Sequence, residues 1–476
     1  MNAKPAVYAA IDIGASSGRV ILGRMGADGP SLEIVHRFPN GVQEIDGALR
    51  WNVEDLFKQV LHGLALAAER TAATGERIAS IGVDTWAVDY GLVYDDGGLA
   101  SQPHSYRDSR TASVVDAVHG KVPFERLYAT TGLQFLPFNT VYQLAAEPSL
   151  EGTQALLIPD LLGYWLTGQR RCEATNASTT GVLDAATGRF AAGLFDALDI
   201  PQDIFPELIQ PGEALGTLLP AIAGKTGLPA DTRVVAVGSH DTASAVAAVP
   251  AADARFAYIS SGTWSLVGVE LSEPIRTEAS RQANFTNERG VDGTIRYLRN
   301  CGGLWLLQEC LREWGSAVTL EEVLAEASAL PAGGPLIDAD SDDFIAPDDM
   351  PHRIRDAAGA ALESPAAVVR CILDSLAQVY ARTLAQAAEL SGRATDVVHI
   401  VGGGSQNRLL CQLTADASGL PVAAGPVEAT ALGNVLVQAR ADGALGSNAT
   451  LTDIRAAVRS TAQTHTYEPS KTLSSI

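Results

Sequence analysis

Val7-Tyr-Ala-Ala-Ile-Asp-Ile-Gly-Ala-Ser-Ser-Gly-Arg-Val-Ile-Leu-Gly23 is the stretch that decides the fold of the chain. Two apolar and partly β-branched runs, residues 7–13 and 20–22, flank a connection of small residues. This pattern is typical of a β-hairpin, and the glycines at its turn favour backbone with positive φ. We therefore expect two paired strands joined by a turn that carries no bulky side chain.

The same turn has the composition of a phosphate-binding loop. Successive backbone amides in a tight turn form an anion site, and the hydroxyls of Ser16 and Ser17 add further donors. Asp12 ends the first strand, and its carboxylate would repel a phosphate unless a cation lay between them. A Mg²⁺ ion held by Asp12 resolves this conflict. The alternative, on these residues alone, is an ordinary hairpin with a solvated aspartate at its end.

Length and charge restrict the classes of protein to consider. A chain of 476 residues exceeds one ordinary hydrophobic core, so we expect two domains. The net charge of −21 and the pI near 4.7 argue against nucleic acid or an anionic membrane as a partner, since both attract a basic surface. An anionic ligand such as ATP would then be held by backbone amides, helix N-termini and a metal ion.

The cysteines and the N-terminus indicate the compartment. Five scattered cysteines without a C-x-x-C pair fit reduced thiols better than disulfides. The few apolar residues before Asp12 resemble neither a secretion signal nor a membrane anchor. We therefore expect a cytoplasmic protein, and no obligate protein partner is inferred. The cysteines are Cys172, Cys301, Cys310, Cys371 and Cys411.

An α/β domain is expected after the hairpin. Residues 32–38 and 49–51 predict short strands, residues 53–71 have helical spacing, and residues 77–83 predict a buried strand. Strands and helices in this order predict a mixed sheet flanked by helices. The residues on the apolar face of the expected helix are Leu56, Val60, Leu64 and Ala67.

The segment Asp84-Thr-Trp-Ala-Val-Asp-Tyr90 is expected at the carboxyl end of a strand, where α/β sheets bind ligands. Its two carboxylates, Asp84 and Asp89, would accept hydroxyl hydrogens of a polyhydroxylated ligand, and Trp86 would pack on C–H groups. The alternative is a strand end with solvated acids and a tryptophan in the core.

Asp241 is the candidate for acid–base chemistry. A buried strand at residues 234–237 meets Gly238-Ser-His-Asp241, and small residues that favour a helix follow from Thr242. One interpretation is a general base that takes the proton of a substrate hydroxyl. The other is an N-cap, whose carboxylate accepts hydrogen bonds from the first turn of the helix.

The second half of the chain repeats the pattern of the first. Residues 256–269 again comprise a strand, a small polar turn and a strand, and the two turns lie at residues 14–18 and 260–265. This duplication predicts two similar domains that hold a nucleotide between their hairpins, with a boundary near residue 250.

Three further features are expected in this half. Asn300 lies in an expected loop that enters an apolar helix, and residues 366–391 predict a long amphipathic helix that stops at Gly392. The run Gly402-Gly-Gly404 after a buried strand leaves bare backbone where a ligand approaches, with Gln406 and Asn407 as hydrogen-bonding groups beside it. An ordinary strand-to-helix turn is the alternative for the glycines.

Taken in order, these segments resemble the FGGY carbohydrate kinases of the actin and hexokinase-like ATPase superfamily, along nearly the whole chain. Chance does not explain so many matches in one order. The segments that carry the resemblance are Asp12-Ile-Gly-Ala-Ser-Ser-Gly-Arg19, Asp84-Thr-Trp-Ala-Val-Asp89, Tyr106-Arg-Asp-Ser-Arg-Thr111, Phe135-Leu-Pro-Phe-Asn-Thr140, Ser239-His-Asp-Thr-Ala-Ser-Ala-Val246, Ser260-Ser-Gly-Thr-Trp-Ser-Leu266, Gly303-Leu-Trp-Leu-Leu-Gln308, Val401-Gly-Gly-Gly404 and Gly425-Pro-Val-Glu-Ala429.

The resemblance implies a fold and an activity. The fold would consist of two similar ribonuclease H-like domains of the actin/hexokinase type, residues 1–249 and 250–476, with the catalytic cleft between them. The first domain would bind the sugar and carry the first phosphate hairpin and the base, and the second would bind the nucleotide. The activity would be phosphorylation of the 1-hydroxyl of L-rhamnulose by ATP with Mg²⁺, in L-rhamnose catabolism.

The resemblance also implies roles for single residues. Asp241 would be the catalytic base, and Asp12 would hold the metal ion. The residues implied to bind ATP are Ala15, Ser16, Ser17, Gly18, Arg19, Thr263, Gln308 and Gly403. The residues implied to bind the sugar are Ala87, His240, Asp241, Thr242 and Asn300.

One position departs from the family pattern. Ala87 stands where the family usually has glycine in Asp-Thr-Trp-Gly-Val-Asp. A methyl group that touches the sugar would shift substrate preference, whereas a methyl group in the core would not. Two other functions stay open: a kinase for another ketose, such as L-fuculose or L-xylulose, and a sugar-binding regulator without activity on the same fold.

Overall fold

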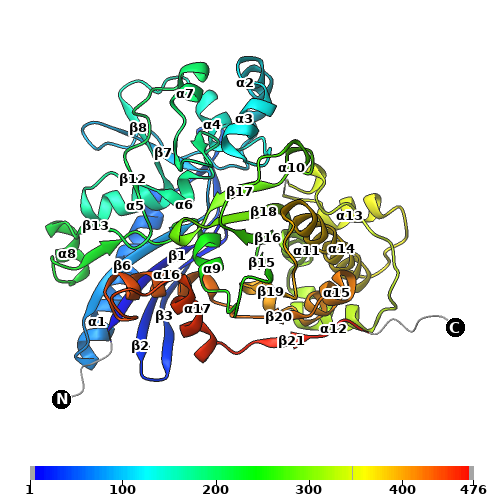
Figure 1. Ribbon diagram of the computed structural model, residues 1–476. Helices are drawn as coiled ribbons and strands as arrows, with labels where there is room; N and C mark the ends of the chain where they lie inside the picture. Colours follow the sequence, from blue (N-terminus) through cyan, green and yellow to red (C-terminus); the bar gives the residue numbers. More distant parts are fainter. Residues whose placement is uncertain (1–5, 346, 471–476) are drawn as a thin grey trace. The chain divides into compact units, whose positions relative to one another are not determined.

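The computed structural model describes residues 6–345 and 347–470, and the chain divides into two compact units (Figure 1). The first unit runs through Ala252 and also includes two later segments, Leu271–Arg296 and Ala429–Ala462. The second unit comprises Asp253–Glu270, Tyr297–Glu428 and the segment that begins at Gln463. The chain therefore enters each unit more than once.

A mixed sheet is the core of the first unit. In the part of the chain that the structure describes, it has six strands in the order β13-β14-β6-β1-β2-β3. Strand β1 pairs antiparallel with β2 and parallel with β6, so the expected hairpin lies at the middle of the sheet. The strands are β1 (Val7–Ile13), β2 (Ser17–Gly26), β3 (Gly29–Pro39), β6 (Ile78–Thr85), β13 (Ala214–Thr217) and β14 (Arg233–Val235).

Helix α1 (Val53–Thr74) confirms the helix expected from spacing. The side chain of Asn52 accepts from the N–H of Asp55 at its start, and Gly75 ends it with a φ of 65°. Its buried face packs beside β2 and β3. That face includes all the residues expected there: Leu56, Val60, Leu64 and Ala67.

Helix α16 (Ala429–Ala441) brings the end of the chain back to the first sheet. Its residues Ala431, Val435 and Ala439 form a buried cluster with Tyr8 of β1 and Ile21 of β2. A strand hairpin near the N-terminus is therefore covered by a helix more than 400 residues later, as the orange helix beside the blue strands shows in Figure 1.

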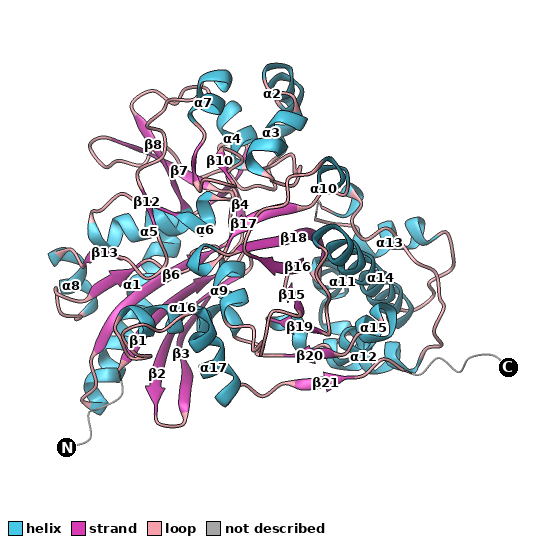
Figure 2. Cartoon of the chain, in the orientation of Figure 1, coloured by secondary structure: helices cyan, strands magenta, loops and turns pink. Residues whose placement is uncertain are grey.

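The rest of the first unit is built from shorter elements (Figure 2), and those between Tyr90 and Leu208 contribute to a second apolar cluster. The shorter elements are β4 (Val42–Ile45), β5 (Ala48–Trp51), β7 (Tyr90–Tyr94), α2 (Val115–Lys121), α3 (Phe124–Thr131), α4 (Thr140–Ala145), β8 (Thr153–Leu157), α5 (Ile158–Thr167), β9 (Cys172–Glu173), α6 (Ala174–Ala177), β10 (Leu183–Asp184), β11 (Arg189–Phe190), α7 (Ala192–Leu198), β12 (Leu208–Ile209), α8 (Pro220–Thr226), α9 (Asp241–Ala247), α10 (Glu278–Gln282), β17 (Thr286–Arg289) and α17 (Leu451–Thr461).

A second mixed sheet contains most strands of the second unit. Over residues 6–345 and 347–470 it has seven strands in the order β17-β18-β16-β15-β19-β20-β21. The elements of this part are β15 (Phe256–Ser261), β16 (Trp264–Leu271), β18 (Ile295–Gly302), α11 (Trp305–Trp314), α12 (Leu320–Ala329), α13 (Met350–Ala358), α14 (Pro365–Ser391), β19 (Val397–Val401), α15 (Arg408–Ser418), β20 (Val422–Ala424) and β21 (His465–Tyr467).

Helix α14 confirms the second expected helix. The hydroxyl of Ser364 accepts from the N–H of Ala367, Pro365 occupies the first turn, and Gly392 ends the helix with a φ of 65°. The stop at Gly392 is the one expected from the sequence.

The two sheets share one topology, which confirms the expected duplication. In each, the first strand of the hairpin, β1 or β15, pairs antiparallel with the second strand of the hairpin and parallel with a later strand, β6 or β19. A further parallel strand, β14 or β20, follows in each sheet, and an antiparallel strand lies beside it. The fold is thus an α/β fold with two similar mixed sheets flanked by helices.

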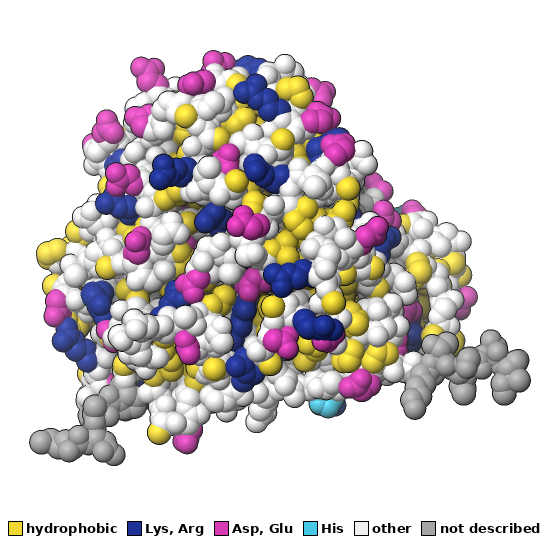
Figure 3. Space-filling model, viewed as in Figure 1, with side chains coloured by type: hydrophobic (Ala, Val, Ile, Leu, Met, Phe, Trp, Pro, Cys, Tyr) yellow, Lys and Arg dark blue, Asp and Glu magenta, His cyan; other side chains and the backbone are white. Residues whose placement is uncertain are grey.

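Charged side chains of both signs alternate over the face drawn in Figure 3. In the described residues, no helix combines the length and the apolar character that crossing a membrane requires.

Candidate functional site

Three carboxylates meet at the carboxyl ends of the central strands of the first sheet. Asp12 and Asp84 are directly opposite in the parallel pairing of β1 with β6. The N–H of Thr85 donates to the carbonyl of Ser239 at 2.9 Å, which places the segment before Asp241 beside the end of β6. Burial and the negative charges of Asp12 and Asp241 raise the pKa of Asp84 well above its ordinary value.

Asp241 is the open carboxylate of the three. Its side chain is 31% exposed, whereas Asp12 and Asp84 are 3% and 0% exposed as residues. It is the first residue of α9, His240 occupies the cap position, and no side chain caps the helix. The hydroxyl of Thr242 donates to Oδ1 of Asp241 at 3.0 Å. The N-cap interpretation is therefore wrong, and the carboxylate faces solvent where it can accept a proton.

Asp12 also carries an ion pair. Nη2 of Arg19 lies 2.8 Å from Oδ2 of Asp12, so two residues expected around one phosphate contact each other directly. The amide of Asn434 on α16 donates to Oδ2 of Asp84 at 2.5 Å. The end of the first sheet thus combines carboxylates with an arginine and an amide.

The turn of the first hairpin differs from the expectation in its backbone. Neither Gly14 nor Gly18 has a positive φ, so the expected left-handed turn was wrong. Gly18 is needed for another reason: a Cβ there would lie 2.2 Å from the ring of Phe38 on β3. Ser16 is exposed, and Ala15 and Ser17 are partly exposed. The turn therefore presents small groups to solvent, as expected, although its shape is set by packing.

Asp89 does not act as expected. It is fully buried, and four donors occupy its carboxylate: the indoles of Trp51 (2.6 Å) and Trp86 (3.0 Å), the N–H of Tyr106 (3.1 Å) and the amide of Gln143 (2.8 Å). A carboxylate with these four donors and no exposed surface does not reach a sugar. Asp89 instead holds the two indole rings, whose centroids are 4.3 Å apart. Asp84, also fully buried, does not reach one either.

Ala87 begins a strained turn. Val88 has a φ of 67°, which is rare for a β-branched residue, and the N–H of Asp89 donates to the carbonyl of Ala87 at 2.9 Å. The carbonyl of Val88 accepts from the hydroxyl of Thr140 at 2.7 Å, which helps to hold the turn. Ala87 as a whole is partly exposed. Strain of this kind is often retained at binding sites.

Sequence reasoning missed the residue that anchors the segment before Asp241. Glu173 is buried, and Oε2 of its carboxylate accepts from both the N–H (3.1 Å) and the hydroxyl (2.7 Å) of Ser239. The same carboxylate also accepts from Thr175, at Oε1 from the N–H and at Oε2 from the hydroxyl. Burial raises the pKa of Glu173. Nothing in the spacing of Glu173 and Ser239, 66 residues apart, indicates this contact.

The second unit brings together two of the residues expected to bind ATP, Thr263 and Gln308. The hydroxyl of Thr263, in the turn between β15 and β16, lies 3.4 Å from Oε1 of Gln308 on α11. Gly403 is exposed and has no atom within 4 Å of an added Cβ, so its backbone is accessible. Gly404, in contrast, needs to be glycine because a Cβ would lie 2.0 Å from the hydroxyl of Ser261.

Two asparagines of the second unit lie elsewhere than expected. Asn300 is on β18 rather than in a loop, because the strand continues to Gly302. Asn407 caps α15: its Oδ1 accepts from the N–H of Leu410 at 3.0 Å, so this side chain belongs to the helix. Gln406 is exposed beside the glycines.

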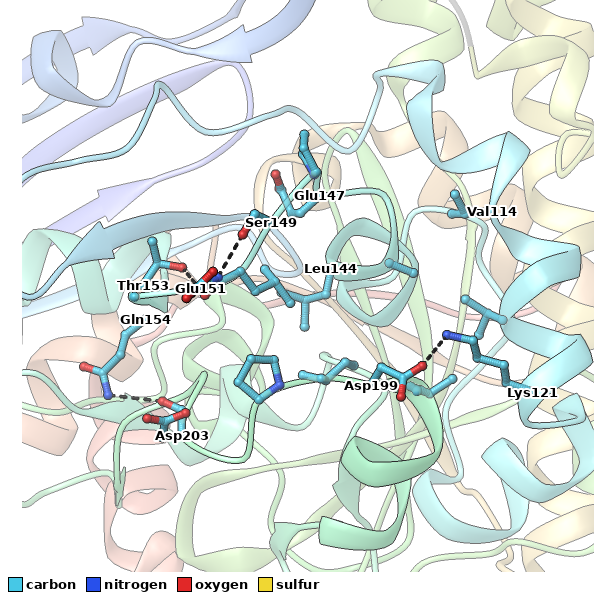
Figure 4. Close-up of a pocket in the computed structure, with 18 of the residues that line it drawn as sticks. Val114, Lys121, Leu144, Glu147, Ser149, Glu151, Thr153, Gln154, Asp199 and Asp203 are labelled. Atoms are coloured by element: carbon cyan, nitrogen blue, oxygen red, sulfur yellow. Dashed lines mark hydrogen bonds and ion pairs between the residues drawn. The ribbon is translucent and has the colours of Figure 1, made fainter.

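A pocket of about 800 Å³ lies in the first unit away from these residues (Figure 4). Lys121 and Asp199 form an ion pair at one side of it, with their charged groups 2.8 Å apart, and Leu144 lies near its middle. None of the residues expected to bind ATP or sugar lines this pocket.

Two family models match the chain. The model for the N-terminal domain of the FGGY family of carbohydrate kinases matches residues 7–248, and the model for the C-terminal domain matches residues 257–441. The chain belongs to the FGGY family of carbohydrate kinases. The expected enzyme class, a phosphotransferase acting on a carbohydrate, is thereby confirmed, and ATP as co-substrate follows from the family.

Individual relatives of this FGGY kinase agree with the family models. It is 43% identical over 442 residues to a rhamnulokinase of Bacteroides thetaiotaomicron, covering 91% of this chain and 90% of the relative. It is 42% identical to a rhamnulokinase of Klebsiella pneumoniae, covering 97% and 94%. The crystal structure of gluconate kinase from Lactobacillus acidophilus matches with a TM-score of 0.79 at 16% identity, covering 98% and 94%, which confirms the fold.

Proposed function

We propose that this FGGY kinase transfers the γ-phosphoryl group of ATP to the 1-hydroxyl of L-rhamnulose, giving L-rhamnulose 1-phosphate and ADP in L-rhamnose catabolism. The observation that carries the proposal is the identity of 42–43% to two rhamnulokinases over at least 90% of each chain. The open carboxylate of Asp241 supports it, because transfer to an alcohol needs a group that accepts the hydroxyl proton.

Asp241 is the proposed general base. The 1-oxygen of the sugar bonds to the γ-phosphorus, the bond from that phosphorus to the bridging oxygen of ADP breaks, and the hydroxyl proton passes to the Asp241 carboxylate. Thr242 and His240 border that carboxylate, with His240 Nε2 3.6 Å from Oδ1. Glu173 fixes the preceding backbone through Ser239, so the base is held in place before substrate arrives.

Asp12 is the proposed ligand of a Mg²⁺ ion. The donor chemistry fits: Mg²⁺ takes carboxylate oxygens, and one or two carboxylates together with phosphate oxygens commonly suffice. Residues 6–345 and 347–470 contain no group of three or more His, Cys, Asp or Glu arranged to hold a metal ion. The bound ion would neutralise phosphate charge. Arg19, paired with Asp12, keeps this carboxylate oriented.

The remaining proposed roles follow the two expected domains: residues 1–249 for the sugar, the first phosphate hairpin and the base, and residues 250–476 for the nucleotide. Small exposed groups in the first turn support phosphate binding there, and the proximity of Thr263 to Gln308 supports a shared nucleotide site. The proposed ATP-binding residues are Ala15, Ser16, Ser17, Gly18, Arg19, Thr263, Gln308 and Gly403. The proposed sugar-binding residues are Ala87, His240, Asp241, Thr242 and Asn300. We propose a cytoplasmic location for the enzyme.

ADP release measured with a panel of ketoses tests the proposal. We expect the highest kcat/KM with L-rhamnulose and lower values with L-fuculose and L-xylulose. A higher value with another ketose would reassign the substrate, and no sugar-stimulated ADP release would favour a regulator without activity.

The Asp241→Asn variant tests the base. The amide keeps the shape of the side chain but does not accept the proton, so kcat should fall by roughly 10² to 10⁴-fold. Calorimetric titration should show sugar binding close to wild type. Near wild-type turnover would contradict the assignment of Asp241.

A further inference from the structure

A buried ion pair lies against the imidazole of His240. Arg296 on β18 is 0% exposed and Glu288 on β17 is 3% exposed, and Nη1 of Arg296 lies 3.0 Å from Oε2 of Glu288. Nε of Arg296 also donates to the carbonyl of Arg289 at 3.1 Å. Two charges buried this completely have a large desolvation cost, so their contact with a candidate active-site residue needs a physical explanation.

The contact with His240 determines which ring nitrogen carries the proton. Nη2 of Arg296 lies 3.1 Å from Nδ1 of His240, in hydrogen-bonding geometry. A guanidinium group only donates, so Nδ1 must accept and the ring proton must be on Nε2. Oε2 of Glu288 lies 3.2 Å from the same Nδ1 and would accept from a protonated Nδ1. That tautomer would leave Nη2 of Arg296 without its acceptor in a buried place, which is unfavourable.

Nε2 of His240 faces the proposed base. It lies 3.6 Å from Oδ1 of Asp241, which is longer than a hydrogen bond but close enough to orient the carboxylate by charge and dipole. The other charged groups nearby are Glu173, which accepts from Ser239, and Asp84, which precedes the Thr85 that pairs with His240. A protonated Nε2 thus points toward the carboxylate and the open side of the site.

We propose that Arg296 is a positioning residue that holds His240 as the neutral Nε2–H tautomer beside Asp241. Nη2 of Arg296 donates a hydrogen bond to Nδ1 of His240, and the carboxylate of Glu288 balances the buried charge of Arg296. His240 then offers one N–H to Oδ1 of Asp241 or to a sugar oxygen, while Oδ2 of Asp241 stays available for the substrate proton. This inference rests on the proposed role of Asp241.

The tautomer is measured without turnover. Nitrogen-15 NMR of the full-length enzyme with labelled histidine distinguishes protonated from unprotonated ring nitrogens, and the His240 signals are assigned by their loss in His240→Gln. We expect Nε2 protonated and Nδ1 unprotonated at pH 7.5. A wild-type His240 protonated at Nδ1 would overturn the proposal. Because this measurement is independent of catalysis, it stands even if Asp241→Asn shows that Asp241 is not the base.

Two variants separate the donor from its counter-charge. Arg296→Met removes the donor to Nδ1, so Nδ1 should become protonated and donate to Glu288, and kcat should fall about 10- to 100-fold with the KM for ATP within about threefold. Glu288→Gln leaves Arg296 beside Nδ1, so the tautomer should persist and kcat should stay within about threefold, although the melting temperature should fall.

Arg370→Met is the matched control. Arg370 on α14 is also a buried arginine paired with a carboxylate, Asp374 at 2.8 Å, and it lies in the other unit. Its replacement should lower stability without changing kcat or the His240 spectrum. An equal loss of kcat in Arg370→Met and Arg296→Met would overturn the positioning role, and so would a wild-type kcat in Arg296→Met. If Arg296→Met does not fold, the spectra of the wild type and of Glu288→Gln still test whether Arg296 sets the tautomer of His240. A changed tautomer in Glu288→Gln would overturn the proposal.

Discussion

The Asp89→Asn substitution should reduce the pH dependence of stability between pH 5 and pH 7.5. Burial raises the pKa of Asp89 from 3.8 to about 6, despite hydrogen bonds from Gln143, Trp51, Trp86 and the N–H of Tyr106 that act in the opposite direction. At pH 5, the folded state holds a proton on this carboxyl group and the unfolded state does not. The wild-type protein therefore gains stability from Asp89 at low pH and loses it as the pH rises through about 6.

The size of the effect follows from the two pKa values. With 3.8 for the unfolded state and about 6 for the folded state, Asp89 contributes about 1.4 kcal/mol more to the free energy of unfolding at pH 5 than at pH 7.5. An asparagine does not titrate in this range. Relative to the variant, the wild type should thus gain about 1.4 kcal/mol of unfolding free energy when the pH is lowered from 7.5 to 5.

Urea unfolding at the two pH values, followed by tryptophan fluorescence, measures this difference. Two of the six tryptophans, Trp51 and Trp86, donate to Asp89, so part of the signal reports on its surroundings. Because the chain has two compact units, the transitions should be fitted separately.

Asp108→Asn is the control for loss of a carboxylate. Asp108 is partly exposed and accepts from two backbone N–H groups, those of Leu49 and Arg110. The same stability difference between wild type and Asp89→Asn at both pH values would refute the reasoning. A change of opposite sign would show that the four donors outweigh burial.

Three further predictions concern the metal, the sugar and the thiols. Asp12→Ala should lower kcat and shift the Mg²⁺ dependence of activity to at least about tenfold higher concentration, because a ligand beside the phosphate turn is lost; an unchanged Mg²⁺ titration would exclude this role. Ala87→Gly should change the ratio of kcat/KM between L-rhamnulose and other ketoses, since a methyl group in a tight site is worth about 1–3 kcal/mol; a lower melting temperature with an unchanged ratio would place the methyl group in the core. Ellman's reagent should react slowly with the native protein, because burial raises the pKa of each thiol, and it should react rapidly with all five thiols once the protein is denatured. Rapid reaction of the native protein would contradict the burial of Cys172, Cys301, Cys310, Cys371 and Cys411.

Local pattern was sufficient to predict the elements that carry their own start, stop and periodicity. Helix α1 has the expected buried face and α14 ends at the expected Gly392, because caps and a repeat of 3.6 residues act within one segment. The two hairpins were found for the same reason, since each strand pairs with its neighbour along the chain. Asp241 was located at the start of α9 from the strand, the tight connection and the small residues around it.

Only the tertiary structure decided what many side chains do. Asp89 looked like a sugar ligand, yet residues from three other segments bury it and occupy its oxygens. Gly18 looked like a turn glycine, yet the ring of Phe38 on the neighbouring strand excludes a side chain there. Glu173 and Arg296 reach the segment around Asp241 from 66 and 56 residues away. These contacts depend on strand register and on burial, which long-range pairing sets and which no short stretch of sequence contains.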